Sequence, residues 1–220
     1  IIAFPALALQ WGSIAAALSV ATMTLGNLLA LAQRNIKRML AYSSIAHAGY
    51  ALIGVVSLSA LGITSVVFYL IVYAITNLAA FGVVAAAGRV IGSDEIADYA
   101  GLSRRSPGLA LAMMVAFLSL AGMPPLGGFV IKVFVFAAAV NSNLIWLAVV
   151  GVLNSIVGLY YYLTVLKVVY LYRSENDEQP LPVPASYATG LWVLSVGIVL
   201  VGTLFAPWFN WATTAAAAMF

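Results

Sequence analysis

The fold is decided by residues 120–132, which read Leu-Ala-Gly-Met-Pro-Pro-Leu-Gly-Gly-Phe-Val-Ile-Lys and interrupt the apolar run 108–141. The two adjacent prolines remove backbone donors, and the three glycines relax the backbone. We therefore expect two half-helices, 108–121 and 128–141, joined by a non-helical break at 122–127. Irregular backbone at membrane depth survives only when it is buried in protein or lines a wet cavity, so we expect this break to be buried.

The composition around this break indicates a polytopic membrane protein. Of the 220 residues, 65% are hydrophobic and only 7% are charged, whereas about 25% of a soluble domain is charged. The absence of Cys argues against a disulfide scaffold, and the apolar excess argues against disorder. The net charge of +3 comes from scattered residues, which disfavours nucleic-acid binding. Continuous apolar runs disfavour a β-barrel, whose strands alternate.

The apolar runs predict an all-α polytopic membrane protein with six segments. Each run reaches the roughly 20 residues that a membrane-spanning helix needs. The segments lie at residues 10–33, 39–60, 62–88, 108–141, 144–170 and 188–208. Because the sequence starts without Met or a signal-peptide pattern, we expect residues 1–9 to be the outer-side stretch of a truncated chain.

The charged side chains predict the orientation in the membrane. Basic residues fall in three loops on one side, namely Arg34, Lys37 and Arg38, then Arg89, Arg104 and Arg105, then Lys167 and Arg173. The opposite side has no Lys or Arg. The positive-inside rule makes the charged side cytoplasmic and both ends of the chain outer. The loop 171–187 is then cytoplasmic, and residues 188–220 form the final membrane helix and an outer tail.

One basic residue, Lys132, remains inside a segment. It lies about nine residues from the outer end, which at 1.5 Å per residue is about 14 Å deep. A lysine there marks a functional site by default, with snorkelling to an interface as the alternative. The same count places His47, Asn77 and Asn154 near mid-membrane. The four residues predict a lateral polar layer, although His and Asn can also serve only to join helices.

Polar stripes on three helices support a wet interior. They comprise Ser43, Ser44, His47 and Tyr50, then Tyr69, Tyr73 and Asn77, then Asn154, Gly158, Tyr161 and Tyr162. Such stripes can hold a chain of waters, and they are equally compatible with helix packing alone. The sequence has a single His, no P-loop and no catalytic triad, so we expect no metal and no cofactor bound to this chain.

Two motifs resemble the antiporter-like proton-pumping subunits, a family that includes three membrane subunits of respiratory complex I and the Mrp cation/proton antiporters. The first motif is residues 26–50, with Asn35-Ile-Lys-Arg-Met-Leu-Ala-Tyr-Ser-Ser-Ile-Ala-His-Ala-Gly-Tyr50, and the second is the 120–132 stretch quoted above. Three details resemble the N-type subunits, called chain 2 in mitochondria. They are Lys132 where M-type subunits typically have Glu, Asn77 where L-type subunits have Lys, and Leu153-Asn154-Ser155 followed by Tyr160-Tyr161-Tyr162.

The resemblance implies a fold of fourteen helices with two inverted five-helix repeats, of which residues 10–170 would be the second repeat, followed by the last helix. It implies a proton-translocating subunit of an NADH:quinone oxidoreductase. Lys132 and His47 would transfer protons, driven by quinone reduction elsewhere. We expect support of this polar axis from Lys37, Ser43, Ser44, Tyr50, Tyr73, Asn77, Asn154 and Tyr161. We expect the break to be shaped by Gly122, Pro124, Pro125, Gly127 and Gly128.

The resemblance also implies the surroundings of the chain. Its partners would be other membrane subunits of complex I, the lipid bilayer and protons. FMN, iron–sulfur clusters and quinone would belong to partner subunits, so this chain itself would do no redox chemistry. The location would be a bacterial plasma membrane, or an organellar inner membrane. Two alternatives stay open: an Mrp-type cation/proton antiporter and a purely structural membrane subunit.

Overall fold

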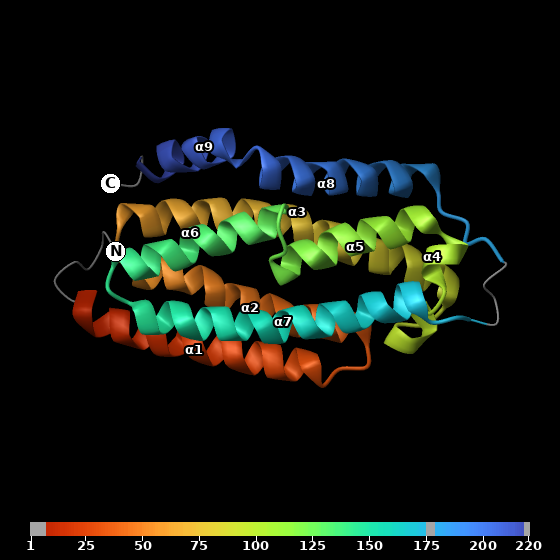
Figure 1. Cartoon of the computed structure of the whole chain (residues 1–220), viewed down its shortest axis with the longest axis horizontal. Helices are drawn as coiled ribbons and strands as arrows, with labels where there is room; N and C mark the ends of the chain where they lie inside the picture. Colours follow the sequence, from red (N-terminus) through yellow and green to blue (C-terminus); the bar gives the residue numbers. More distant parts are fainter. Residues whose placement is uncertain (1–7, 175–178, 218–220) are drawn as a thin grey trace.

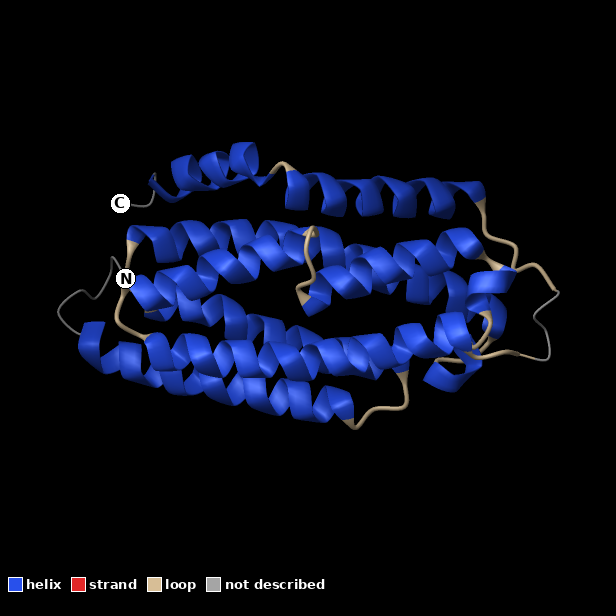
Figure 2. Cartoon of the chain, viewed as in Figure 1, coloured by secondary structure: helices blue, strands red, loops and turns tan. Residues whose placement is uncertain are grey.

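The computed structural model describes residues 8–174 and 179–217, and in these ranges the regular structure is helical (Figures 1 and 2). The long helices are α1 (Ala8–Leu31), α2 (Ile36–Val56), α3 (Ala60–Ile91), α5 (Pro107–Ala121), α6 (Gly127–Asn141), α7 (Ile145–Leu171), α8 (Ala185–Thr203) and α9 (Phe205–Ala217). Two short helices, η2 (Ile96–Tyr99) and α4 (Leu102–Arg105), connect α3 to α5.

Among the described residues, five helices are long and apolar enough to cross a membrane, namely α1, α2, α3, α7 and α8. Four of them, α1, α2, α3 and α7, overlap the first, second, third and fifth expected segments. Part of the expected outer stretch, residues 1–7, lies outside the described ranges, as do residues 175–178 of the expected cytoplasmic loop and residues 218–220 of the expected tail.

The C-terminal region differs from the expected helix 188–208 followed by a tail. The helix ends at Thr203, and α9 follows it up to Ala217. Aromatic packing holds α9 in place, because the ring of Phe209 stacks on Phe134 of α6 with centroids 4.0 Å apart. Residues 209–217, which were expected to form an outer tail, therefore pack against the bundle as part of α9.

The break between α5 and α6 follows from its residues. Gly122 ends α5 with φ of 89°, a left-handed conformation that glycine adopts without steric cost. Pro124 and Pro125 cannot donate backbone hydrogen bonds, so α6 begins only after them. A Cβ on Gly128 would overlap the carbonyl oxygen of Ser119, so the first turn of α6 passes directly beside the last turn of α5.

The break is only partly buried in this chain. Residues 126–128 are buried, and α8 lies so close that a Cβ on Gly202 would overlap the carbonyl oxygen of Pro125. Residues 123–125 are nevertheless exposed on the surface of the chain. The expectation of a wholly buried break is therefore wrong for the described residues taken by themselves.

Helices α1 and α2 pack at very short range. A Cβ on Gly26 would lie 2.6 Å from the backbone nitrogen of Ala46, and a Cβ on Gly49 would lie 2.6 Å from Met23 Cγ. Small residues at a helix interface allow backbones to approach in this way. The polar residue that follows Gly26, Asn27, is thereby held against α2.

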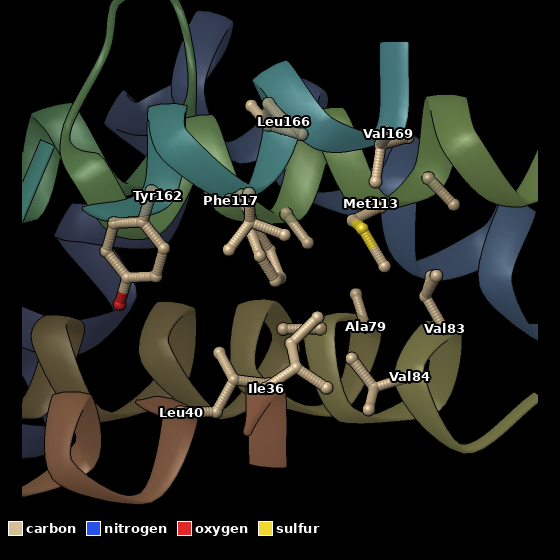
Figure 3. Packing of buried hydrophobic residues seen from close by; sticks show 14 of the residues in the cluster. Ile36, Leu40, Ala79, Val83, Val84, Met113, Phe117, Tyr162, Leu166 and Val169 are labelled. Atoms are coloured by element: carbon tan, nitrogen blue, oxygen red, sulfur yellow. The ribbon is translucent and has the colours of Figure 1, made fainter. Parts of the chain in front are cut away.

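A large apolar cluster fixes α7 against α2, α3 and α5 (Figure 3). The ring of Phe117 on α5 meets the ring of Tyr162 on α7 edge-on, with centroids 5.5 Å apart. Leu166 and Val169 extend the same contact along α7 (Figure 3). This packing sets the height and rotation of α7 and so positions its tyrosines.

The charged loops meet at one end of the bundle (Figure 1). Ile36 N–H donates to the Asp94 carbonyl at 2.8 Å, and Leu181 N–H donates to the Arg105 carbonyl at 2.9 Å. The first bond joins the loop after α1 to the loop after α3. The second joins the loop after α3 to the loop after α7. Tyr99 is buried there, and its burial raises the pKa of its hydroxyl above the usual value.

Candidate functional site

Lys132 lies near the start of α6 and points back across the break toward α5. Its Nζ donates to the carbonyl oxygens of Leu120 at 3.1 Å and Ala121 at 3.0 Å. The last carbonyls of a helix have no partner within it and form the negative end of the helix dipole. The side chain is 6% exposed. The ammonium group therefore satisfies carbonyls that the break leaves free.

Tyr50 of α2 provides the second contact of this ammonium group. Lys132 Nζ lies 5.0 Å from the centroid of the Tyr50 ring, within the range of a cation–π interaction. The same ring meets His47 edge-on, with centroids 5.7 Å apart. Lys132 and His47 thus contact one tyrosine, and the fold brings the two expected proton-transfer residues together.

His47 lies on α2 and contacts two tyrosines of α3. Its Nδ1 is hydrogen-bonded to the hydroxyl of Tyr69 at 2.7 Å, and its ring stacks on Tyr73 with centroids 4.9 Å apart. The side chain is buried. Tyr69 is therefore the direct partner of the imidazole. It belongs to the polar stripe of α3 but is not among the expected site residues.

Asn27 of α1, which is not among the expected site residues, is the hydrogen-bonding centre of the site. Its Nδ2 donates to the hydroxyl of Tyr50 at 3.1 Å and to the backbone carbonyl of Asn154 at 3.2 Å. Its Oδ1 accepts from the hydroxyl of Tyr161 at 3.1 Å. The amide is 1% exposed. One side chain of α1 therefore joins α2 to two turns of α7.

The polar contacts continue from Asn27 toward the charged end. The rings of Tyr161 and Tyr162 lie 4.5 Å apart, and the Tyr162 hydroxyl is hydrogen-bonded to Ser43 Oγ on α2. Ser44, in contrast, donates to the Leu40 carbonyl of its own helix at 3.0 Å. Ser43 therefore takes part in the interhelical contacts, whereas Ser44 donates to a carbonyl of its own helix.

Two expected supporting residues lie apart from this cluster. Lys37 is in the first turn of α2 at the charged end, where its Nζ forms a 2.8 Å salt bridge with Asp94. Its side chain is 48% exposed. Asn77 is half-buried on α3, one turn beyond Tyr73. The structure thus gathers Lys132, His47 and the tyrosines but leaves Lys37 at the surface.

Two buried hydroxyls of the site lack hydrogen-bond partners among the described residues. They are Tyr73 Oη, beside His47, and Ser155 Oγ on α7. A buried polar group without a partner is costly, and buried water normally satisfies such groups. The cluster therefore has places where single waters would be stabilised.

Carbonyl dipoles at the end of α5 and the Tyr50 ring are the groups that stabilise the positive charge of Lys132. Within residues 8–174 and 179–217, no carboxylate is paired with Lys132, and Asp94, Glu95 and Asp98 lie in the loop after α3. Over the same ranges, no group of three or more His, Cys, Asp or Glu side chains is placed to hold a metal ion. The arrangement can hold and release a proton at Lys132, with His47 as a second titratable neighbour.

Residues 1–158 match the family described as NADH:quinone oxidoreductase/Mrp antiporter, transmembrane. The chain is 45% identical over 212 residues to the NADH-quinone oxidoreductase subunit N of Heliobacterium modesticaldum, covering 96% of this chain and 44% of that relative. The similarity to the subunit N of Moorella thermoacetica is 44% over 218 residues, covering 99% of this chain and 46% of the relative. The chain therefore spans about half the length of the relatives it matches.

Solved structures have the same fold. A chain of respiratory complex I from Thermus thermophilus superposes with a TM-score of 0.76 at 34% identity, covering 90% of this chain and 45% of that one. A chain of the Mrp complex from Dietzia sp. superposes with a TM-score of 0.87 over 94% of this chain and 47% of that one. Its identity is 24%, so this second likeness concerns the fold alone.

Proposed function

The chain belongs to the NADH:quinone oxidoreductase/Mrp antiporter family of membrane proteins, and from this premise we propose that it is part of a proton-translocating, N-type membrane subunit of an NADH:quinone oxidoreductase. The relatives named subunit N support this reading, since they are 44–45% identical to the chain over the aligned residues, which make up 96–99% of its length. FMN, iron–sulfur clusters and quinone would be bound by partner subunits, and quinone reduction there would drive this chain.

Lys132 is the proposed proton-carrying group, and the observation that carries the proposal is how its ammonium is held. Two carbonyls at the end of α5 and the ring of Tyr50 stabilise the charged form. The two carbonyl contacts are lost if α5 moves away from α6, and the ring contact is lost if α2 does, because each contact depends on geometry rather than on a paired carboxylate. A movement of these helices would therefore favour release of the proton.

His47 is the proposed neighbour in proton transfer. It shares the Tyr50 ring with Lys132, and its imidazole stacks on the ring of Tyr73, whose buried hydroxyl has no hydrogen-bond partner among the described residues. A water at that hydroxyl would extend a hydrogen-bonded path from the imidazole toward Lys132. Water-mediated hydrogen bonds are nearly as favourable as direct ones, so His47 and Lys132 need no direct contact.

The proposed topology has six membrane crossings, with α5 and α6 together forming the fourth. Each of these two helices has 15 residues, or about 22 Å, which is too short alone for a hydrocarbon core of about 30 Å. Residues 10–170 would form one five-helix repeat, followed by the final helix. The charged end would face the cytoplasm of a bacterium, because it carries the basic loops.

Other membrane subunits are the proposed partners. Residues 123–125 are exposed irregular backbone in the middle of the bundle, and such backbone does not face lipid in membrane proteins. A neighbouring protein segment over residues 123–125 would remove this conflict. That segment would belong to another membrane subunit, or to a part of the protein that these 220 residues do not include.

The test uses the complete protein in its membrane complex, reconstituted into liposomes, with NADH oxidation and proton uptake measured together. We expect Lys132→Met and Lys132→Arg both to lose proton pumping through this subunit. Arginine keeps the positive charge and can still donate to the carbonyls, but it does not release its proton, so loss in both variants separates proton exchange from packing. Lys37→Met, which changes the exposed lysine of the same chain, is the control.

The outcomes decide between the readings. Unchanged pumping in Lys132→Met would show a purely structural subunit. Cation-driven proton movement in the absence of NADH would show an Mrp-type antiporter.

A further inference from the structure

We propose that Asn27 interrupts proton transfer between two groups of buried hydroxyls, and so prevents protons from leaking through this chain to Lys132. The proposal rests on the proposed function of Lys132. It gives Asn27 a role in that function through Tyr50 and Tyr161, which it positions.

Asn27 lies directly between two tyrosine hydroxyls. Its Nδ2 donates to Tyr50, and its Oδ1 accepts from Tyr161, each at 3.1 Å. Because the amide is 1% exposed, solvent does not reach this junction from outside the bundle. A proton that passes from Tyr161 to Tyr50 along these hydrogen bonds has to cross the amide.

The two hydroxyls lead to different parts of the molecule. Tyr50 contacts the Lys132 ammonium through its ring. The ring of Tyr161 packs against the ring of Tyr162, whose hydroxyl is hydrogen-bonded to Ser43. Ser43 precedes Tyr50 by seven residues on α2, about 10 Å nearer the charged end of the bundle. The amide therefore separates Lys132 from the polar groups that approach the charged end.

The chemistry of an amide makes this junction an insulator. A hydroxyl or a water accepts a proton and gives up another at the same oxygen, so it relays protons. In the Asn side chain the acceptor is the oxygen and the donors are on the nitrogen, so the group holds both hydroxyls without passing a proton between them. Carboxylates and imidazoles relay protons, whereas the amide at this position does not titrate.

Neighbouring residues hold the amide in place. Asn27 Nδ2 also donates to the Asn154 carbonyl at 3.2 Å and to its Oδ1 at 3.3 Å. Asn154 Nδ2 in turn donates to Thr24 Oγ1 at 3.3 Å and to the Val150 carbonyl at 3.0 Å. A flip of the Asn27 amide would place its oxygen against these acceptors, so the surroundings fix one orientation.

A pump has a physical reason to keep such an insulator. One charge that returns across the membrane releases about 2.3 kcal/mol per 100 mV, so any continuous proton path dissipates the gradient. A path interrupted at Asn27 can conduct only when helix movement or an entering water bypasses the amide.

The test changes one atom of the side chain. In the complete protein within its reconstituted complex, Asn27→Asp keeps the size of the side chain and supplies a carboxylate that relays protons. We expect a several-fold rise in passive proton permeability without NADH, with fewer protons pumped per NADH and an undiminished rate of NADH oxidation. Asn35→Asp is the matched control, because Asn35 caps α2 at the exposed charged end and Asp caps equally well.

Two further variants keep the proposal falsifiable. Asn27→Leu removes the same hydrogen bonds and adds no relay, so it should not increase the leak, and an equal leak in Leu and Asp would overturn the proposal. If Asn27→Asp does not assemble, Asn27→Ser replaces it, because its hydroxyl and an accompanying water can relay protons. If the variant that assembles, Asp or Ser, shows no increase in passive proton permeability, the proposal is also overturned.

The proposed function and the role of Asn27 fail in distinguishable ways. Lys132→Met with unchanged pumping refutes the function, whatever Asn27 does. Lost pumping in Lys132→Met together with no leak in Asn27→Asp refutes only the insulator.

Discussion

Lys132 and Lys37 show how differently one chain can hold the same ammonium group. Lys37 is 48% exposed and forms a 2.8 Å salt bridge with Asp94, in a region where the charged loops meet. Lys132 is buried and contacts two carbonyls and a tyrosine ring. A carboxylate holds its partner over a range of geometries, whereas helix-end carbonyls and ring faces do so only when the helices are correctly placed.

Protonation can be coupled to helix movement at the break between α5 and α6 more strongly than at the charged end. At the charged end, a shift of a helix changes little, because water replaces any lost contact. At the break, the same shift removes the contacts of a charge in a region of low dielectric, where each contact is worth more.

Gly128→Ala should break the geometry at the central site. The added Cβ would overlap the Ser119 carbonyl, so α5 and α6 would have to separate and the Lys132 contacts would lengthen. Overpacking of this kind costs about 1–3 kcal/mol, and we expect a lower melting temperature with loss of pumping. Gly108→Ala is the control, because a Cβ on Gly108 meets nothing within 4 Å. Equal behaviour of the two variants would contradict the close passage of the helices.

Tyr50→Leu and Tyr50→Phe separate the ring from the hydroxyl. Leucine removes the ring under Lys132, a cation–π contact worth about 2 kcal/mol when desolvated. Phenylalanine keeps the ring and loses the bond to Asn27, worth about 0.5–1.5 kcal/mol. We expect the Leu variant to lose more pumping and more thermal stability than the Phe variant. The reverse order would show that the hydroxyl matters more than the ring.

Asp94→Asn should have the smallest effect. A salt bridge with side chains 48% and 33% exposed contributes about 1 kcal/mol or less and is screened by salt. We expect a small decrease in melting temperature at low salt, which disappears at high salt, with pumping unchanged. A large loss that persists at high salt would remove the contrast with Lys132.

The central features could be predicted because they stand out in an apolar background. A lysine and a proline pair within 108–141 have no packing role in a continuous membrane helix, so both pointed to the site. His47 and Tyr50 were identified in the same way, as polar residues on one face of α2. These predictions needed only the period of a helix and the cost of burying charge.

Asn27 was missed because counting residues from a helix end assumes that all ends lie at one level. It lies four residues before the end of α1, and by such a count a residue in this position is near the charged surface. Its partner Asn154 lies seventeen residues before the end of α7. α1 is displaced along the bundle relative to α7 (Figure 1), and a displacement of this kind depends on packing between helices that the sequence does not display.

Contacts between elements that the sequence does not display also decide the positions of Lys37 and α9. Lys37 belongs to the motif that carries the family resemblance, but its helix begins at the charged end, where Asn35 caps it and Asp94 meets it. Residues 209–217 follow the expected final segment and contain three polar residues, Asn210, Thr213 and Thr214, so they were expected to form a tail. Contact of Phe209 with α3 and α6 makes this segment helical in the structure.

The break between α5 and α6 is also a mechanical joint, and two sets of hydrogen bonds, or ties, hold its two sides together. The Gly128 N–H donates to Ser119 Oγ at 3.0 Å, and neither group changes its charge, so this tie is constant. The bonds from Lys132 to Leu120 and Ala121 form the second tie, and a charged donor makes hydrogen bonds roughly twice as strong as a neutral one. A proton gained or lost at Lys132 would therefore alter the stiffness of this joint, and a chemical event at one nitrogen would change how readily α5 and α6 bend relative to each other.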